Sequence, residues 1–295
     1  MIRRQKEILI KNLFFFFSLI SLLILFLIVA FLFREGLPLF RDVSLWDFLF
    51  GNEWYPTYQP PSYGIWPLIV GSLIVTFLSS LIAVPIGIMS AIYISEIAPA
   101  ALKEVLKCVI ELLAGLPSVV LGFFGMVVLA PWLQETFDLP TGLNIVNAAL
   151  ILALMAVPTI SSISEDALYA VPREFKEASY ALGATKYETI IRVIIPSAFS
   201  GITTAVILGM ARAIGETMVV LMVAGGAAAI PESLFDSVRP MPASIAAEMG
   251  EAPFRSGHYH ALFATGIVLF FMTLLFNLVA DYVSHKFREE GSGTL

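Results

Sequence analysis

The sequence predicts an all-α, polytopic membrane protein with six transmembrane helices. The first observation is composition: the 295 residues are 58% hydrophobic and 14% charged, with a mean hydropathy of +0.88. A soluble domain carries about 25% charged residues. The second observation is that apolar runs recur along the whole chain, and about 20 such residues cross a bilayer. We place the six spans near residues 13–33, 65–94, 108–132, 144–164, 201–228 and 261–284.

The first span follows a basic start that resembles the beginning of a signal peptide. Four basic residues precede the apolar run of residues 13–33: Arg3, Arg4, Lys6 and Lys11. The run is longer than a usual signal core, and no small-x-small cleavage site follows it. We therefore interpret it as an uncleaved transmembrane helix.

The distribution of Lys and Arg orients the spans, because cytoplasmic loops of membrane proteins carry an excess of basic residues. With the N-terminus in the cytoplasm, twelve of the 17 basic residues lie in cytoplasmic segments: Arg3, Arg4, Lys6, Lys11, Lys103, Lys107, Arg173, Lys176, Lys186, Arg192, Lys286 and Arg288. The four external ones are Arg34, Arg41, Arg239 and Arg255, and Arg212 lies inside a span. Both termini are therefore expected in the cytoplasm, in agreement with an even number of spans.

The two long external segments carry aromatic and histidine residues. Residues 34–64 contain six aromatics that either anchor at the membrane interface or form a docking surface for an external protein: Trp46, Phe48, Trp54, Tyr55, Tyr58 and Tyr63. Residues 229–260 contain His258 and His260. Two loop histidines without a third ligand nearby are more typical of plain surface residues than of a metal site, so no metal is expected. The single cysteine, Cys108, excludes an internal disulfide and is expected to be buried.

The fifth predicted span contains ILGMARAIGETMVVLMVAGG at residues 207–226 and carries two charges. If the span starts near Gly201, Arg212 lies about 17 Å along it, near the middle of a hydrocarbon core of about 30 Å. Glu216 follows four residues later and would share a helix face with Arg212. The two residues form either a structural ion pair or part of a substrate pathway. We favour the pathway, because intramembrane charges usually face a polar cavity.

The chemistry of this pathway suits an oxyanion. The planar guanidinium of Arg212 binds two phosphate oxygens at once and stays charged. Glu216 would hold the guanidinium when substrate is absent, or accept a proton from a hydrogen-phosphate hydroxyl. Ser118 and Thr217 complete the predicted pathway residues. Ser118 lies in a stretch rich in glycine and proline, residues 115–122, which either breaks the third span beside the cavity or serves packing alone.

The cytoplasmic segment 171–202 reads VPREFKEASYALGATKYETIIRVIIPSAFSGI. Its first part has helical periodicity, and Gly183 then supplies a turn. Residues 187–195 predict a second amphipathic helix, which Pro196 ends. The alternative is an interfacial helix that lies on lipid, but such a helix requires neither the glycine nor the proline at these points.

This segment resembles the cytoplasmic loop of binding-protein-dependent ABC importer permeases, whose pattern is E-A-A, three residues, G, nine residues, I-x-L-P. Here the pattern reads Glu177-Ala178-Ser179, Gly183 and Val193-Ile194-Ile195-Pro196 at the full spacing, with conservative departures at Ser179, Val193 and Ile195. The resemblance implies the ABC importer type I permease fold. It also implies a coupling helix at residues 171–200 that seats on a separate ATPase subunit through Glu177, Ala178, Gly183 and Pro196.

Two further stretches, ELLAGLPSVVLGFFG at 111–125 and GMARAIGETMVVLMVAGG at 209–226, resemble the phosphate-specific permease subunit of the PstC type. That resemblance implies one subunit of an ATP-driven phosphate importer in a bacterial or archaeal cytoplasmic (inner) membrane, working by alternating access. The implied partners are a second related permease, two copies of an ATPase and an external phosphate-binding protein. The implied organisation is a first helix and external loop at 1–64, a permease core at 65–285 and a cytoplasmic tail at 286–295.

Neither catalytic residues nor a cofactor are expected in this chain, which lacks the glycine-rich phosphate loop of ATPases. ATP and Mg would bind the partner ATPase. Three alternatives stay open. The same machine would carry molybdate, tungstate or sulfate. A secondary transporter or channel would use Arg212 and Glu216 as a relay, but it leaves the loop 177–196 unexplained. A membrane enzyme would use Glu165 and Asp166, although adjacent residues on a helix point about 100° apart.

Overall fold

The computed structural model describes residues 2–292 as a bundle of helices. Five segments are long and apolar enough to cross a membrane: Ile10–Arg41, Trp66–Ile97, Ser118–Phe137, Ile145–Tyr169 and Gly257–Val279. A helix pair bent by 69°, Lys186–Ser197 with Phe199–Ile214, makes the sixth when it is counted as one span. The predicted all-α polytopic class is therefore confirmed.

Most secondary-structure elements of the described residues are helices. The long helices are α1 (Ile2–Gly36), α3 (Trp66–Ile92), α7 (Ile145–Tyr169), α11 (Phe199–Ile214) and α14 (Gly257–Ser292). The shorter helices are α2 (Leu45–Phe50), α4 (Ala100–Ala114), α5 (Ser118–Phe124), α6 (Ala130–Phe137), α8 (Arg173–Ala181), α9 (Lys186–Thr189), α10 (Ile195–Ser197), α12 (Met218–Val223) and α13 (Met241–Glu248). Three π-helical turns, η2 (Tyr93–Ile97), η3 (Gly125–Leu129) and η4 (Ile190–Ile194), and the 3-10 helix η1 (Leu37–Arg41) extend them. Strands β1 (Trp54–Tyr55) and β2 (Ser62–Tyr63) pair antiparallel.

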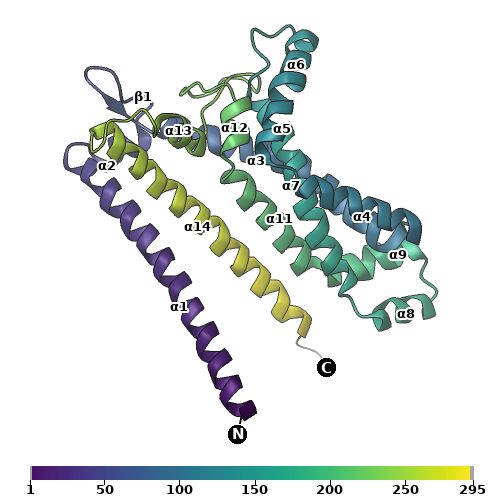
Figure 1. The fold of residues 1–295 in the computed structure, drawn as a ribbon. Coiled ribbons are helices and arrows are strands. Elements are labelled where there is room, and N and C mark those ends of the chain that lie inside the picture. The colour runs from purple at the N-terminus through teal and green to yellow at the C-terminus, as the bar shows by residue number, and fades with distance from the viewer. Residues whose placement is uncertain (1, 293–295) are drawn as a thin grey trace.

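Helix α7 lies at the centre of the bundle, where it packs against α3, α4 and α11 (Figure 1). Small residues let two of these helices come close to Ile160 of α7. A Cβ atom added at Gly87 of α3 would lie 2.8 Å from Cγ2 of Ile160, and one added at Gly209 of α11 would lie 2.6 Å from Cγ1. Glycines at helix crossings permit this close approach in membrane bundles.

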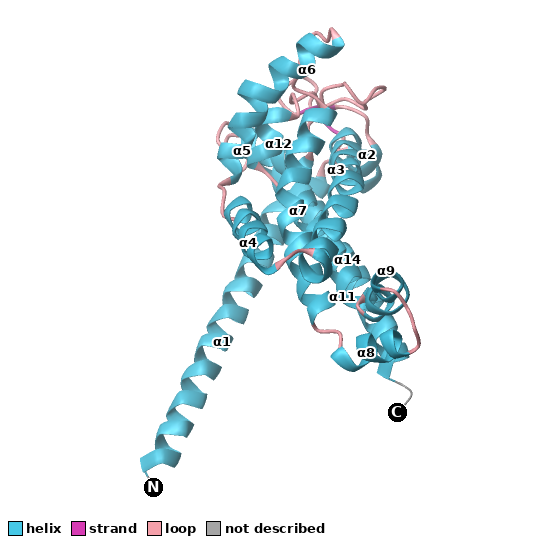
Figure 2. Cartoon of the chain, turned by 90° about the vertical axis from the view of Figure 1, so that its right-hand side faces the viewer, coloured by secondary structure: helices cyan, strands magenta, loops and turns pink. Residues whose placement is uncertain are grey.

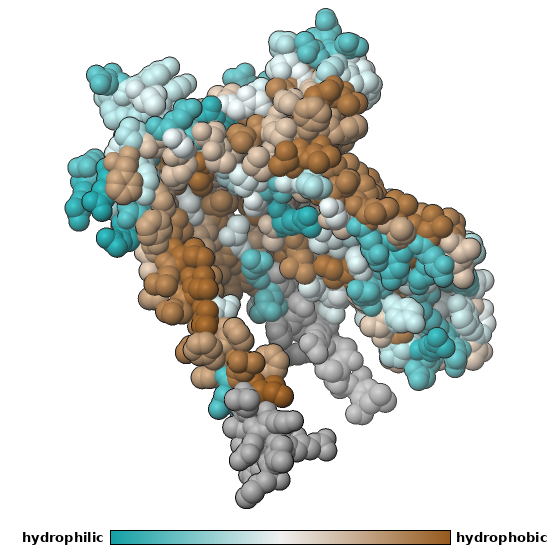
Figure 3. All heavy atoms as spheres, in the orientation of Figure 1, coloured by the Kyte–Doolittle hydropathy of each residue, from teal (hydrophilic) through white to brown (hydrophobic). Residues whose placement is uncertain are grey.

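Helix α1 lies at the edge of the bundle and packs on α14 (Figure 1). Its N-terminal part stands away from the other helices (Figure 2), and its apolar residues are exposed along the span. Figure 3 shows hydrophobic atoms along this side, and hydrophilic atoms gathered over the loops at the top and over α8 and α9. A large exposed apolar surface of this kind is covered by lipid or by another protein.

The two chain ends point the same way in the structure. The start of α1 and the end of α14 lie at the end of the bundle that also carries α8 and α9, whereas α13 and β1 lie at the opposite end (Figure 1). This arrangement agrees with an even number of membrane crossings. The assignment of the α8 end to the cytoplasm still rests on the charge count and stays a prediction.

The third span was predicted at residues 108–132, and its predicted first residue was wrong. The spanning segment is Ser118–Phe137, and the residues before it form the separate helix α4. The helices separate at Pro117, because a proline lacks a backbone N–H and disfavours a helical residue before it. Helix α4 has no buried residue, and its Cys108 is exposed, contrary to expectation.

The fifth predicted span, residues 201–228, is not one helix. Helix α11 ends at Ile214, and α12 begins only at Met218. At its other end α11 meets the helix before it at the 69° bend, which follows Ser197. Pro196 was expected to end the preceding helix, but that helix continues for one more residue, to Ser197.

The loops at the end opposite α8 enclose a small hydrophobic cluster. Phe48, Trp54 and Met241 are fully or almost fully buried, together with Ile65 and Leu68. Two of the six aromatics in residues 34–64, Phe48 and Trp54, therefore stabilise the fold. Others in the same segment, Trp46 and Tyr58 among them, are exposed.

One carboxylate, Glu248, joins four segments of this region. Its oxygens accept hydrogen bonds from Nε1 of Trp54 at 3.0 Å, from Nη1 of Arg239 at 2.6 Å and from Oγ of Ser244 at 3.1 Å. Nε2 of His258 lies 2.8 Å from its other oxygen. His258 is buried, so the expectation that it is a plain surface residue was wrong.

Substituting Glu248 by alanine is expected to lower the free energy of unfolding by about 2–3 kcal/mol, because three donors lose a charged acceptor. The value lies below that of a fully buried pair, since the side chain of Arg239 is 31% exposed. The melting temperature of the purified protein in detergent should fall by about 3–5 °C, given the length of the chain. Glu251→Ala, which changes an exposed glutamate nearby, is the matched control. Equal melting temperatures for the two variants would contradict the stabilising role of Glu248.

Candidate functional site

The break between α11 and α12 holds three of the predicted pathway residues. Arg212 lies in the last turn of α11, and Glu216 and Thr217 lie in the break itself. Gly215, the C-cap residue of α11, has φ −90° and ψ −1° and so leaves the helical path. The hydroxyl of Thr217 donates to the carbonyl of Gly215 at 3.4 Å. Backbone polar groups freed by such a break are tolerated in a membrane where they line protein or a polar cavity.

The guanidinium of Arg212 is exposed on the surface of the single chain. Its Nη1 donates to the hydroxyl of Thr159 on α7 at 3.3 Å. Thr159 follows Pro158, a proline inside α7. A charge in this position needs a polar surrounding, because placing an arginine at the middle of a bilayer costs about 2.5–3.5 kcal/mol on insertion scales.

Glu216 does not share a helix face with Arg212, contrary to the prediction from their spacing. The prediction required a continuous helix, and α11 ends between the two residues. Within the part of the chain that the structure describes, the two side chains form no ion pair within 4.0 Å. Glu216 is half-buried and accepts the backbone N–H of Val219 at 3.5 Å. The arrangement leaves most donors of Arg212 available to another group.

Ser118 lies at a second break, which faces the first across packed helices. It is the first residue of α5, directly after Pro117. Helix α5 packs closely on α12: a Cβ atom added at Gly122 would lie 2.8 Å from Sδ of Met222. Among the described residues, however, neither a hydrogen bond nor an ion pair connects Ser118 with Arg212. The structure therefore brings the two broken spans together without joining their predicted pathway side chains.

The predicted coupling segment forms a compact unit of two helices. Gly183 joins α8 to α9 with φ +84°, a left-handed conformation that side chains resist. The hydroxyls of Ser179 and Thr189 lie 2.9 Å apart and are buried, so they hold the two helices together. Ser179 is one of the departures from the E-A-A pattern, and this contact gives it a structural reason.

Helix α9 begins with a capping box that the sequence analysis missed, although its T-x-x-E spacing was readable. Thr185 accepts from the backbone N–H of Glu188, and Oε2 of Glu188 accepts from the N–H of Thr185 at 2.9 Å. The hydrogen bonds that the Glu188 carboxylate accepts from the backbone N–H and the hydroxyl of Thr185 lower its pKa below its ordinary value. The outer surface of the unit is exposed, including Glu177 and Ala178. Leu182 is 90% exposed, which is typical of a surface that another protein covers.

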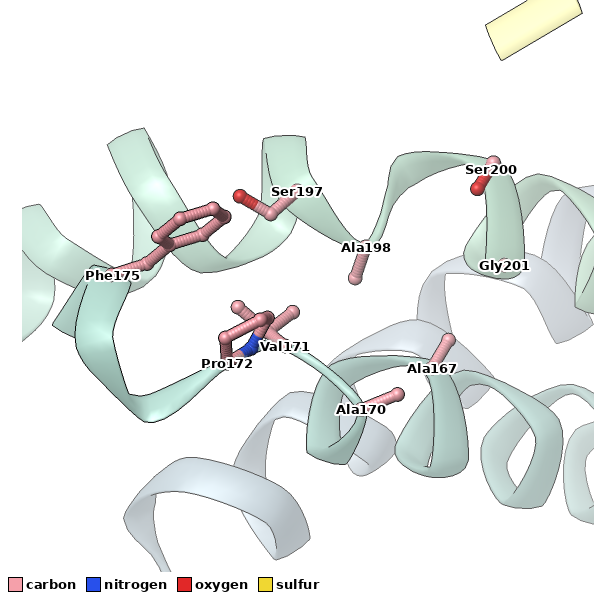
Figure 4. A pocket seen from close by; sticks show the side chains of 9 residues that line it. All are labelled: Ala167, Ala170, Val171, Pro172, Phe175, Ser197, Ala198, Ser200 and Gly201. Atoms are coloured by element: carbon pink, nitrogen blue, oxygen red, sulfur yellow. The ribbon is translucent and has the colours of Figure 1, made fainter. Parts of the chain in front are cut away.

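A hollow of about 270 Å³ lies behind this unit (Figure 4). Ala167 of α7 and Ala170, which directly follows this helix, form one side, and the other is formed by Ser197, Ala198, Ser200 and Gly201. Val171, Pro172 and Phe175, where the chain passes from α7 into α8, complete the lining. The hollow lies at the 69° bend, so the start of α8 is not tightly packed against α11.

The carboxylates considered for an enzyme site have other surroundings. Glu165 is buried and lies 3.1 Å from Nζ of Lys107, whereas Asp166 is exposed. They do not form a paired acid site. Within residues 2–292, where described, no group of three or more His, Cys, Asp and Glu residues could hold a metal ion.

Comparison with known proteins shows which family this chain belongs to. The sequence pattern of the family described as "Binding-protein-dependent transport system inner membrane component" matches residues 83–289. The chain is 44% identical over 261 residues to the "Probable ABC transporter permease protein YqgH" of Bacillus subtilis (strain 168), covering 88% of this chain and 84% of that protein. It is 37% identical over 247 residues to the "Phosphate transport system permease protein PstC" of Pasteurella multocida (strain Pm70), covering 77% and 76%.

Solved structures share the fold at low sequence identity. A bacterial alginate ABC transporter, solved in complex with its alginate pentasaccharide-bound periplasmic protein, superposes with a TM-score of 0.65, 16% identity and 97% of both chains covered. The inward-facing MetNI methionine ABC transporter gives a TM-score of 0.57 and 20% identity, with 76% of this chain and 94% of that chain covered. The expected ABC importer permease fold is thereby confirmed. Sequence and fold together show that this chain belongs to the binding-protein-dependent transport system inner membrane component family, as a multi-pass permease subunit of an ABC transporter and not an enzyme.

Proposed function

We propose that this chain is one permease subunit of an ATP-driven importer for phosphate and contributes half of its translocation pathway. The observation that carries the proposal is the exposed guanidinium of Arg212 at a helix break within an otherwise apolar span. A planar guanidinium binds two phosphate oxygens in parallel. The 37% identity to a phosphate transport system permease supports the same substrate.

The second residue of the proposed pathway, Glu216, distinguishes phosphate from sulfate. A carboxylate accepts the hydrogen of a monohydrogen phosphate, and sulfate carries no such hydrogen at neutral pH. Thr217 and Ser118 offer hydroxyls at the same two helix breaks. Molybdate, tungstate and sulfate are the rival substrates, because an arginine alone does not discriminate among oxyanions.

The chain works with partners in this proposal. A second related permease supplies the other half of the pathway, and an external phosphate-binding protein delivers the substrate. Two ATPase subunits bind ATP and Mg and receive the coupling helix, whose proposed contact residues are Glu177, Ala178, Gly183 and Pro196. ATP binding closes the ATPase pair and opens the permeases outward, and hydrolysis resets them. The exposed surface of α8 and α9 supports such a docking contact.

A reconstituted assembly tests the function. Proteoliposomes that contain this chain, the second permease, the ATPase and the binding protein should accumulate labelled phosphate when ATP is supplied, and excess unlabelled sulfate or molybdate should not compete. Omission of the second permease should abolish uptake, because this chain supplies only half of the pathway. Active transport by this chain and the ATPase alone would contradict the heterodimer. Competition by molybdate stronger than by phosphate would assign the machine to the rival substrate.

A further inference from the structure

Helix α4 meets the bundle through ion pairs and through a few half-buried apolar residues, Leu106, Ile110 and Leu113. It has no buried residue. Two of its lysines reach one carboxylate of α7: Nζ of Lys107 lies 3.1 Å and Nζ of Lys103 lies 3.5 Å from Oε1 of Glu165. The Glu165 side chain is only 5% exposed. Nζ of Lys103 also lies over the ring of Tyr169, 5.5 Å from its centroid.

The contact with Glu165 favours the charged form of Lys107. The hydrogen bond to Glu165 is the largest cause that raises the pKa of Lys107 above its usual value. Removing one partner of a buried ion pair is strongly destabilising, so Lys103 and Lys107 hold α4 against Glu165. The position of α4 therefore depends on where α7 holds Glu165.

A second ion pair lies beside the first and comes directly from the predicted coupling helix. Nζ of Lys176 on α8 lies 2.7 Å from Oε1 of Glu96 in η2. The hydroxyl of Ser95 donates to the same oxygen at 3.0 Å. The side chains of Lys176 and Glu96 are 23% and 10% exposed, so water screens this pair less than a surface pair.

The chain path places both pairs between the coupling helix and the substrate pathway. On one side, α7 ends at Tyr169 and α8 begins at Arg173, so Glu165 and Lys176 lie on either side of a short connection. On the other side, η2 leads into α4, and α4 leads through the break at Pro117 to Ser118. A displacement of α8 therefore reaches α4 in two ways. Lys176 moves Glu96 in η2, which precedes α4. The end of α7 moves Glu165, which pairs with two lysines of α4.

We propose that the pairs Lys176–Glu96 and Lys103/Lys107–Glu165 form an ionic clasp, which transmits movement of the coupling helix to α4 and so sets the position of the α4–α5 break. The five side chains are positioning residues that act through α4 and do not touch substrate. The proposal rests on the proposed function, because it needs the ATPase to move α8. In this proposal the clasp is the route by which the movement of α8 reaches the α4–α5 break.

The outer pair of the clasp is tested by charge exchange in the complete reconstituted transporter, with phosphate taken up per ATP hydrolysed as the measurement. Glu96→Lys and Lys176→Glu should each lower this ratio by about tenfold, within the range of typical coupling energies, while the ATPase still co-purifies. The double variant with both changes should regain at least half of the ratio, because the pair is rebuilt with exchanged charges. Lys11→Gln, which changes an exposed lysine on α1 outside the coupling segment, is the control.

The buried pair is tested without leaving an unpaired charge. Glu165→Gln combined with Lys103→Gln and Lys107→Gln removes all three charges together, so the chain should reach the membrane in normal amounts and yet transport with a similarly reduced ratio. Glu104→Gln, on the exposed side of α4, is the control. A wild-type ratio in the triple variant overturns the clasp, and so does a charge exchange that fails to restore the ratio.

Failure of the clasp and failure of the proposed function give different results. If Gly183→Val uncouples the transporter while the clasp variants behave as the controls do, the coupling assignment stands and the clasp is wrong. If Gly183→Val also transports normally, the ATPase does not act through α8, and both assignments fall.

Discussion

The variant Arg212→Gln is expected to lower labelled-phosphate uptake by about a hundredfold or more, since removal of a charged, hydrogen-bonding partner from a dehydrated contact costs about 3 kcal/mol. Glutamine keeps a polar side chain of similar length but loses both the permanent charge and the two parallel donors. Membrane abundance should stay normal. The only hydrogen bond of Arg212 to a described residue is the long one to Thr159, and Arg212 is exposed.

Two further variants separate substrate contact from simple charge balance. Arg41→Gln makes the same chemical change at an exposed site in η1, at the end of the first spanning segment, and should leave uptake unchanged. The double variant Arg212→Gln with Glu216→Gln leaves neither charge in the span. If Arg212 serves only to balance Glu216 in another state of the transport cycle, the double variant regains uptake. Near-normal phosphate uptake in the double variant would therefore remove Arg212 from the pathway.

The spans that sequence reasoning placed well are the long uninterrupted ones. The runs at 13–33 and 261–284 lie within long apolar helices of the structure, and those at 65–94 and 144–164 begin one residue before theirs. Burial in a bilayer demands a continuous apolar stretch, so composition alone reveals such helices. The third span failed because α4 has an apolar face that reads as part of the run, although Lys103 and Lys107 mark it as amphipathic.

The geometry of the candidate site could not be predicted from neighbouring residues in the sequence. A lone glycine such as Gly215 is tolerated inside many helices, so the break after Ile214 could not be read from its neighbours. The predicted i, i+4 pair failed with it. The residues that surround Glu248 and Glu165 come from distant parts of the chain, and only the packing of helices brings them together. The coupling segment differs, because its turn at Gly183 was predicted and its cap, although missed, is also a local feature of the sequence.

That coupling segment yields the second large effect. Gly183→Val is expected to abolish phosphate uptake while ATP hydrolysis continues, because a β-branched residue does not adopt a φ of +84° without strain. Crowding is not the cause, since a Cβ atom at this position would meet nothing within 4 Å. The strain shifts α8 relative to α9 and so misplaces the surface that docks on the ATPase in the proposed function.

Gly183→Asn is the matched control for this backbone effect. Asparagine adds a side chain of about the same size as valine, but it tolerates the left-handed conformation. Uptake by the Asn variant should therefore stay within about threefold of the wild type, since an αL position costs it little. If Val and Asn are equally harmful, added bulk at the docking surface and not the turn is the cause.

The role of charge at the proposed docking surface is tested at Glu177, which lies on α8 before Gly183. Its side chain is exposed, so Glu177→Arg should leave the fold and the membrane abundance intact. In the proposed function Glu177 faces the ATPase, and a reversed charge that meets a like charge there costs several kcal/mol, so transport per ATP should fall as steeply as in Gly183→Val. Uptake is measured together with co-purification of the ATPase. Normal uptake in both Glu177→Arg and Gly183→Val would mean that α8 is not the coupling helix, because neither its turn nor its charge would then matter to the ATPase.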